Sequence, residues 1–401
     1  MSDKAFDVVV VGAGPGGSAA AAFLAERGFQ VALIDRAAFP RPKPCAEYLS
    51  PEAGRILERL GALTAVQLHA QRLVGMTVVS PAGQRFTGRF SGAAPYRGFS
   101  DHGLALPRMI LDAELVRIAA GKGAHVMQRT RLEQLGALNG RRTVVVRDDA
   151  ERHTLTARLV VGADGLNSRV AEQLGLSRRG PRRRVAFVAH VSGVHGMGDL
   201  GEMHVGRRAY VGLAPVGPDL TNVAVVLDAS RPIPGSSARE RFDAGLAQFP
   251  EIVERLHGAE VVGPVLAAGP FARTTRRATA ERVVLVGDAA DFYDPFTGEG
   301  VFAALRGAEL VVEHVAGLLE HDTLSSGALA VYDRARRRQF RGKWLNERAI
   351  AFAIDQPALF DRIADRLGRR AGMADLLVGV TGDFVPPRAV LHPAFALRLV
   401  L

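Results

Sequence analysis

Residues 6–36 predict a strand, a tight turn, a helix and a second strand, in that order. Residues 8–11 are four consecutive valines, a β-branched run typical of a buried parallel strand. Residues 18–27 are rich in Ala, Leu and Glu and favour a helix, and the apolar run 31–34 favours a strand that Asp35 closes. The turn before the helix consists of Gly12, Ala13, Gly14, Pro15, Gly16 and Gly17.

Farther along the chain the hydrophobic pattern changes twice. From about residue 182 the apolar and polar positions alternate, which is typical of antiparallel strands. At 282–286 the buried-strand type returns, so distant pieces of chain must complete the first sheet. Antiparallel strands are predicted at 185–191, 201–205, 209–214 and 221–227. Helices are predicted over 51–60, 107–120, 238–256, 298–319 and 328–352.

These patterns together indicate an α/β protein with a Rossmann-like nucleotide-binding domain, an inserted antiparallel β-sheet domain and C-terminal helices. The nucleotide-binding domain is discontinuous, because parallel-sheet segments occur at both ends of the chain. Its predicted pieces are 1–71, 102–181 and 270–325. The inserted substrate domain takes 72–101 and 182–269, and the helical region takes 326–401.

The glycine turn has the residues that a dinucleotide requires. Gly12 permits the tight turn, Gly14 lets a pyrophosphate approach the backbone, and Gly17 lets the helix pack close to the strand. The helix N-terminus offers unpaired N–H groups and partial positive charge to the phosphates. Asp35 ends the second strand and accepts hydrogen bonds from a ribose. This unit alone leaves FAD and NAD as alternatives.

Two later segments repeat the arrangement of a strand that ends in a Gly/Asp turn. One contains Asp164 and the other contains Asp288. Ligands of open α/β sheets bind at the carboxyl ends of the strands, so both turns are expected at the crevice of the first. Beyond them, Gly298 and Gly300 place bare backbone at the start of a long helix, where negative charge is stabilised.

The three motifs, GAGPGG at Gly12, GADG at Gly162 and GDAADFYDPFTGEG at Gly287, resemble those of FAD-dependent oxidoreductases. The resemblance is to the p-hydroxybenzoate hydroxylase-like fold, and within it to the geranylgeranyl reductase family. It implies a Rossmann-like FAD-binding domain with FAD as cofactor. The implied cofactor-binding residues are Gly12, Ala13, Gly14, Pro15, Gly16, Gly17, Asp35, Arg36, Cys45, Ala46, Arg108, Leu132, Ala163, Asp164, Gly165, Gly287, Asp288, Pro295, Gly298, Gly300 and Val301.

Three residues are candidates for catalysis. Cys45 lies in a Lys-Pro-Cys loop similar to that of geranylgeranyl and menaquinone reductases, whose cysteine lies beside the flavin. A packed, inert cysteine is the alternative. Glu47 stands where that family usually has glycine, and it supplies a carboxylate to the loop. Asp294, between the ribityl-binding aspartate and the flavin loop, is a candidate acid toward the substrate, with a solvated loop residue as the alternative.

The resemblance implies that the enzyme reduces C=C bonds of a small apolar, isoprenoid-like substrate by hydride transfer from flavin N5. The first alternative is a monooxygenase that hydroxylates an aromatic or polyketide-like substrate through a C4a-hydroperoxyflavin. The second is a non-catalytic flavin-binding electron relay. No second GxGxxG follows a strand, so the electrons are expected from transient NAD(P)H binding or from an electron-donor protein.

Composition and charge limit the partners, metals and cellular location that are expected. The net charge of +10 is mostly arginine and is discounted as a functional signal, so no nucleic-acid partner is expected. The lone Cys45 excludes an internal disulfide, and His190, His195 and His204 lack metal-ligand spacing, so no metal is expected. The first strand begins near the N-terminus and no apolar run has about 18 residues, which predicts a cytoplasmic protein. A basic stretch over 334–348 is interpreted as a solvated helix or as a peripheral membrane or donor-protein contact.

Overall fold

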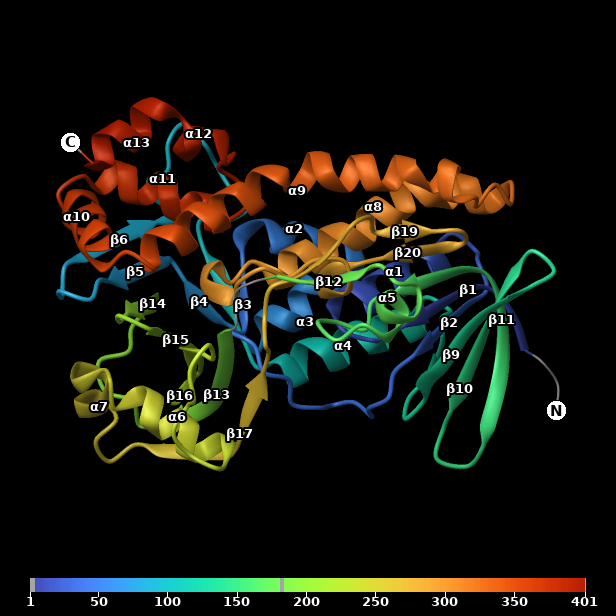
Figure 1. The fold of residues 1–401 in the computed structure, drawn as a ribbon, viewed down its shortest axis with the longest axis horizontal. Coiled ribbons are helices and arrows are strands. Elements are labelled where there is room, and N and C mark those ends of the chain that lie inside the picture. Colours follow the sequence, from blue (N-terminus) through green and yellow to red (C-terminus); the bar gives the residue numbers. More distant parts are fainter. Residues whose placement is uncertain (1–3, 181–183, 401) are drawn as a thin grey trace.

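The computed structural model describes residues 4–180 and 184–400, and Figure 1 shows its two large sheets. The first sheet has eight strands. Five of them, in the order β8-β2-β1-β11-β20, run parallel, which confirms the Rossmann-like prediction. The strands of this sheet are β1 (Lys4–Val11), β2 (Val31–Ile34), β8 (His125–Met127), β9 (Arg131–Leu138), β10 (Arg141–Arg147), β11 (Arg152–Gly162), β19 (Thr279–Ala280) and β20 (Val283–Leu285).

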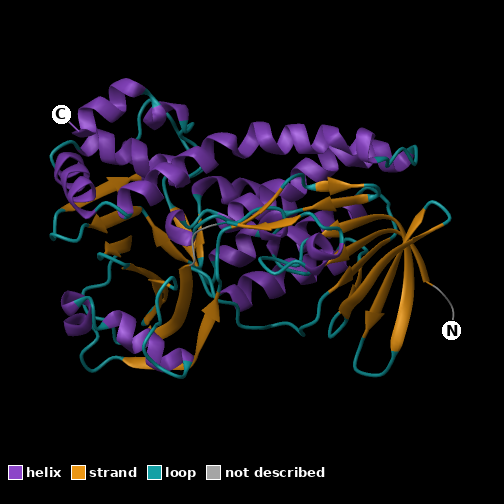
Figure 2. Cartoon of the chain, viewed as in Figure 1, coloured by secondary structure: helices purple, strands orange, loops and turns teal. Residues whose placement is uncertain are grey.

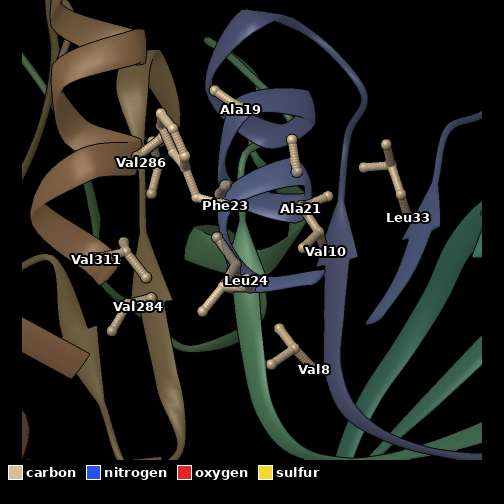
Figure 3. Packing of buried hydrophobic residues seen from close by; sticks show 14 of the residues in the cluster. Val8, Val10, Ala19, Ala21, Phe23, Leu24, Leu33, Val284, Val286 and Val311 are labelled. Atoms are coloured by element: carbon tan, nitrogen blue, oxygen red, sulfur yellow. The ribbon is translucent and has the colours of Figure 1, made fainter. Parts of the chain in front are cut away.

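Helix α1 (Pro15–Glu26) is the central packing element on this sheet. Figure 3 shows it between β1 and α8 (Gly300–Glu320), with Phe23 and Leu24 at the interface. The close approach depends on glycine, because a Cβ at Gly17 would lie 1.8 Å from the carbonyl oxygen of Gly12. The other helices on this domain are α2 (Pro51–Leu60), α3 (Leu63–Gln67), α4 (Arg108–Gly121) and α5 (Arg169–Gln173).

The second sheet has seven strands in the order β17-β13-β16-β15-β14-β5-β6. Its pairs are antiparallel except β14 with β5, which run parallel. One face packs against α6 (Ala238–Leu246) and α7 (Pro250–Arg255), burying alternate residues such as Phe187, Val211 and Val225. The strands are β5 (Gly75–Val79), β6 (Arg85–Arg89), β13 (Arg184–Ser192), β14 (Leu200–Val205), β15 (Ala209–Gly217), β16 (Leu220–Asp228) and β17 (Glu260–Ala268).

Two small sheets join the domains, and the C-terminal helices form a layer along the top of the view in Figure 2. α11 packs on β6, so this layer also contacts the inserted sheet. The small sheets consist of β3 (Tyr48–Leu49), β4 (Gln71–Leu73) and β7 (Gly103–Ala105), and of β12 (Ser177–Arg179) and β18 (Arg273–Thr275). The helices are α9 (Ser326–Ile354), α10 (Pro357–Gly368), α11 (Ala371–Thr381), α12 (Arg388–Leu391) and α13 (Pro393–Val400).

Most predicted elements are present, but the pattern gave no separate bounds for α3 or for the helices α10, α11, α12 and α13. The helix predicted over 51–60 is α2, and the Ser50 side chain caps it at the Ala53 N–H. The single helix predicted over 238–256 is wrong: the chain turns and Pro250 starts a second helix. Strands β9 and β17 were not predicted from the pattern. The domain bounds stay a prediction, and their boundary at 181 and 182, like residue 401, lies outside the described residues.

The basic stretch on α9 is not uniformly solvated. Arg336 is buried and pairs with Asp291 at 2.7 Å, and Lys343 is buried among carboxylates. The remaining basic side chains, Arg334, Arg337, Arg338, Arg341 and Arg348, are exposed. Within the described part of the chain, no helix combines the length and hydropathy needed to cross a bilayer.

Replacing Gly17 with Ala is expected to destabilise the protein by about 1–3 kcal/mol, because the added methyl overlaps backbone that cannot move freely. The matched control is Gly121→Ala at the end of α4, where a Cβ meets nothing within 4 Å. That change is expected to leave the free energy of unfolding unchanged or raise it by up to about 1 kcal/mol. Urea unfolding of both variants tests the prediction, and equal stability of the two would contradict it.

Candidate active site

A single cavity of about 1290 Å³ is lined by residues of both large sheets. It exceeds the roughly 300–1000 Å³ that drug-sized ligands occupy, so it has room for a dinucleotide and a second molecule. Its walls include all three glycine-rich motifs as well as the inserted sheet. The sequence motifs therefore converge on one site, as the positions of the strand ends predict.

At one end of the cavity the glycine turn presents open backbone. Gly12 has a φ of +99°, and a Cβ there would lie 2.5 Å from the Ala163 carbonyl oxygen. Gly14 is the N-cap of α1, and a Cβ there would meet only the Arg108 guanidinium, at 3.9 Å. The first N–H groups of α1 thus face the cavity without a covering side chain, as an anion site requires.

Asp35 fixes the end of β2 against this turn. Its carboxylate accepts hydrogen bonds of 2.8 Å from the N–H groups of Ala13 and Ala37. Arg36 and Leu132 line the cavity beside it, and Arg41 approaches the Asp35 carboxylate at 3.9 Å. This end has the carboxylate and the apolar wall expected for a ribose and its base.

The two later aspartates differ in what they bind. Asp164 accepts hydrogen bonds from the Ser168 hydroxyl at 2.6 Å and from the N–H groups of Arg169 and Val170, so it caps α5. Asp288 makes no hydrogen bond to any of the described residues, and burial raises the pKa of its carboxyl. It lines the cavity with its polar group unsatisfied, which marks it as a ligand-binding group.

At the other end of the cavity a second helix presents its N-terminus. Gly298 has a φ of +71° in the turn that precedes α8, and α8 begins at Gly300. The short helical turn Pro295–Thr297 leads into it, and the Asp294 side chain caps that turn at the Phe296 N–H. The side chain of Glu299 turns toward Lys343 instead of covering the helix end. Gly298, Gly300 and Val301 therefore line the cavity with backbone.

Comparison with known proteins assigns this arrangement. The profile of the FAD binding domain family matches residues 5–343. The chain belongs to this FAD-binding family. A digeranylgeranylglycerophospholipid reductase of Methanothrix thermoacetophila is 31% identical over 90% of this chain and 88% of its own length.

Two solved structures extend the comparison. A geranylgeranyl bacteriochlorophyll reductase-like protein from Thermoplasma acidophilum has a TM-score of 0.82 at 20% identity over 99% of both chains, which shows the shared fold. The flavin-dependent halogenase CmlS has a TM-score of 0.76 at 26% identity, over 85% of this chain and 63% of that one. The protein is an FAD-dependent oxidoreductase.

The cavity fits FAD on its own geometry. The open backbone at Gly14 and the unsatisfied carboxyl of Asp288 lie along one cavity, and the N-terminus of α8 ends it. These groups suit a pyrophosphate, a polyol and a flavin edge that gains negative charge on reduction. Arg108 lies beside Gly14, and its guanidinium forms a bidentate pair with the buried Asp112, both hydrogen bonds being 2.8 Å long.

Cys45 and Ala46 line the cavity between its two ends. The Cys45 sulfur accepts a hydrogen bond from the Glu47 N–H at 3.3 Å and lies next to the Arg108 guanidinium. Glu47 itself has a φ of +59°, the left-handed region that glycine adopts without strain. The departure from glycine thus keeps the backbone conformation of the loop and adds a side chain to it.

The Glu47 carboxyl is buried and accepts hydrogen bonds from residues of three elements, α4, β13 and β16. It accepts hydrogen bonds from the Arg108 N–H at 2.7 Å, the His190 Nε2 at 2.6 Å and the Asn222 side-chain amide at 2.9 Å. It is not among the residues that line the cavity, so as a catalytic residue Glu47 stays a prediction. Its hydrogen bonds fix the cysteine loop to α4 and to the inserted sheet.

Asp294 is buried at the cavity wall in a second network. The Arg184 guanidinium binds it at 2.6 Å, and the Tyr210 hydroxyl donates to it at 2.7 Å. Burial raises the pKa of the Tyr210 hydroxyl, which stays a hydrogen-bond donor. Asp294 as an acid toward substrate also stays a prediction. His204, by contrast, pairs with Glu202, and no group of three metal-ligating side chains gathers anywhere in the described ranges.

The inserted sheet forms the wall of the cavity beyond these networks. The residues that face the cavity alternate with those buried under α6 and α7, and many of them are small. The three alanines and the glycine among them leave room for an apolar ligand against the sheet. The residues that face the cavity are Ala186, Val188, Met203, Tyr210, Gly212, Ala214, Asn222, Ala224 and Val226.

Asn222 is a site residue that the sequence pattern did not single out, and His190 was considered there only as a metal ligand. They are paired across β13 and β16, and both donate to Glu47. The period of β13 places His190 on the same face as Ala186 and Val188, but its partner is 143 residues away in the sequence. Only the fold brings them together.

The hydrogen bond from Glu47 raises the pKa of His190 above its usual value of about 6.5. The hydrogen bond between His190 and Glu47 therefore stabilises the folded state fully below pH 6.5. This stabilisation is lost as the pH rises through the raised pKa of His190. Replacing His190 with Gln is expected to destabilise by roughly 1 kcal/mol or less at pH 6, and by less at pH 8.5. Urea unfolding at both pH values measures this. His257→Gln, at an exposed position, is the control, and an equal loss at both pH values for His190→Gln would contradict the assignment.

Proposed function

We propose that this oxidoreductase reduces C=C bonds of an apolar, isoprenoid-like substrate. The observation that carries the proposal is the continuity of one cavity from the FAD-binding motifs to an apolar sheet face lined by Gly212, Ala214 and Ala224. The name of the Methanothrix relative, digeranylgeranylglycerophospholipid reductase, supports the same class of reaction.

In this proposal the N-terminus of α1 holds the pyrophosphate, Asp35 binds the adenosine ribose and Asp288 binds the ribityl chain. The backbone over 298–300 would hold the pyrimidine edge of the flavin, because the dipole of α8 stabilises negative charge at its N-terminus. FAD held there would supply, in its reduced form, a hydride to one carbon of the double bond. The inserted sheet and Cys45 hold the substrate and exclude water from it.

A flavin monooxygenase is the second candidate. Its support is the similarity to the halogenase CmlS, at 26% identity and a TM-score of 0.76. The FAD motifs are common to both classes and do not separate them. In either case we propose that NAD(P)H or an electron-donor protein reduces the flavin by transient contact.

The test uses the purified holoenzyme, photoreduced without oxygen and followed by flavin absorbance. Addition of a geranylgeranyl lipid under anaerobic conditions is expected to reoxidise the flavin and to yield a product heavier by two hydrogens per reduced bond. Oxygen incorporation into the lipid or an aromatic substrate on admission of O₂ would contradict the reductase proposal. Bound FAD with no turnover of either kind would favour an electron relay.

Filling the sheet face tests where the substrate binds. Ala224→Phe places a ring in the cavity, so we expect turnover of the lipid to fall at least tenfold while FAD content stays unchanged. Ala247→Phe, at an exposed position of the same domain, is the control and is expected to retain activity. Steady-state turnover and flavin absorbance measure both effects. Full activity of Ala224→Phe would place the substrate elsewhere.

A further inference from the structure

A group of three carboxyls and one amine, buried except for the partly exposed Glu347, lies where α9 crosses the start of α8. Lys343 contacts Glu299 at 3.2 Å and also contacts Asp383, and the three side chains are at most 9% exposed. Glu347 follows Lys343 by one turn of α9. We call Glu299, Lys343, Glu347 and Asp383 the carboxyl–lysine cluster.

The charges of the carboxyl–lysine cluster do not balance. One ammonium faces three carboxyls, and Asp294 adds a further negative charge near Glu347, where Arg348 partly offsets it. The Tyr48 ring packs against Gly298, in the turn before α8, and its hydroxyl donates a hydrogen bond to the Thr381 carbonyl. Oε1 of Glu299 and Oδ2 of Asp383 are buried and accept no hydrogen bond from the described residues. An ionised carboxylate with a buried, unpartnered oxygen is costly, so the geometry favours a bound proton.

The pKa shifts have the same direction. Burial raises the pKa of Glu299 to about 8 and that of Glu347 to about 7, and it raises the pKa of Asp383. Burial lowers the pKa of Lys343, but Asp383 and Glu299 raise it by more, so the lysine stays charged. Near neutral pH the carboxyl–lysine cluster therefore retains at least one carboxylic acid.

The cluster also reaches the active site. Glu299, Lys343 and Glu347 line the cavity, as does Trp344 between the last two, whereas Asp383 lies behind them. Glu299 belongs to the turn that holds the backbone of Gly298 and Gly300 at the flavin end. Two of the titratable carboxyls, those of Glu299 and Glu347, thus lie in the wall of the cavity that is proposed to hold the substrate.

We propose that Glu347 donates the proton for C=C reduction and that Glu299 and Asp383, with Lys343, hold the proton that replaces it. The inference rests on the proposed reductase function. The π bond of the substrate breaks, the hydride forms one C–H bond, and the Glu347 carboxylic O–H supplies the proton of the other. Glu347 is left as a carboxylate and regains its proton from the buried carboxyls and finally from water.

Whether the carboxyl–lysine cluster holds a proton can be tested without turnover. Infrared spectra of the full chain, with and without FAD, are recorded from pH 5 to 9. A carboxylic acid C=O band that titrates between about pH 7 and 8 is expected in the unmodified protein, because the two glutamates have these pKa values. It should weaken in Glu347→Gln and in Glu299→Gln and persist in the control Glu320→Gln, at the exposed end of α8. The absence of any carboxyl titrating above pH 6 would overturn the inference.

The donor role needs turnover as well. Glu347→Gln is expected to lower the rate of lipid reduction about 10²-fold or more, with unchanged FAD content and an unchanged rate of photoreduction. Glu347→Asp should recover part of the rate. The unmodified enzyme should slow above about pH 7, as Glu347 loses its proton, and Glu347→Gln should lose this dependence.

The outcomes separate the two proposals. A Glu347→Gln enzyme with the normal rate and pH profile would overturn the donor role of Glu347 while leaving the reductase function intact. An unmodified enzyme that reduces no C=C bond would overturn the reductase function and the donor role together. In that case the infrared titration would still decide whether the carboxyl–lysine cluster holds a proton.

Discussion

The contact between Gly12 and Gly17 is the constraint on which the cofactor end of the molecule depends. Any side chain at Gly17 would overlap the Gly12 carbonyl, so only glycine lets α1 lie this close to β1. That closeness aims the first N–H groups of α1 at the cavity and leaves Gly14 uncovered. Parallel pairing within the same sheet then brings the strand ends that precede Asp35, Asp164 and Asp288 to the same edge as this turn.

The buried and partly buried carboxyls around the cavity divide into two classes by their partners. Glu47, Asp164 and Asp294 accept two or more hydrogen bonds each, and they connect loops to helices and sheets. Asp288 accepts none from the described residues, and Glu299 and Asp383 leave one oxygen unpartnered. Because a buried polar group without a partner is unfavourable, the second class is where a ligand or a proton is expected. The motifs GADG and GDA look alike in sequence, but Asp164 and Asp288 fall on opposite sides of this division.

The sequence predicted those features that depend on local pattern. The strand at residues 31–34 and helix α2 have the predicted bounds, because a short apolar run and a Ser-Pro start are local signals. Strand β9 was not predicted, because apolar and polar residues do not alternate regularly over 131–138. The sequence also did not predict two buried pairs, Glu47 with His190 and Lys343 with Asp383. Their members are 143 and 40 positions apart and meet only through the packing of whole domains.

The charged residues at the flavin end come from different parts of the chain. The family profile ends at residue 343, whereas Glu347 and Asp383 lie beyond it. Lys343 is the last residue of the matched range, and Asp383, from the segment after α11, adds a carboxyl to the ion pair that Lys343 makes with Glu299. The titratable groups at the flavin end come from both sides: the inserted sheet places Arg184 and Tyr210 against Asp294, and α9 and the segment after α11 place Lys343 and Asp383 against Glu299.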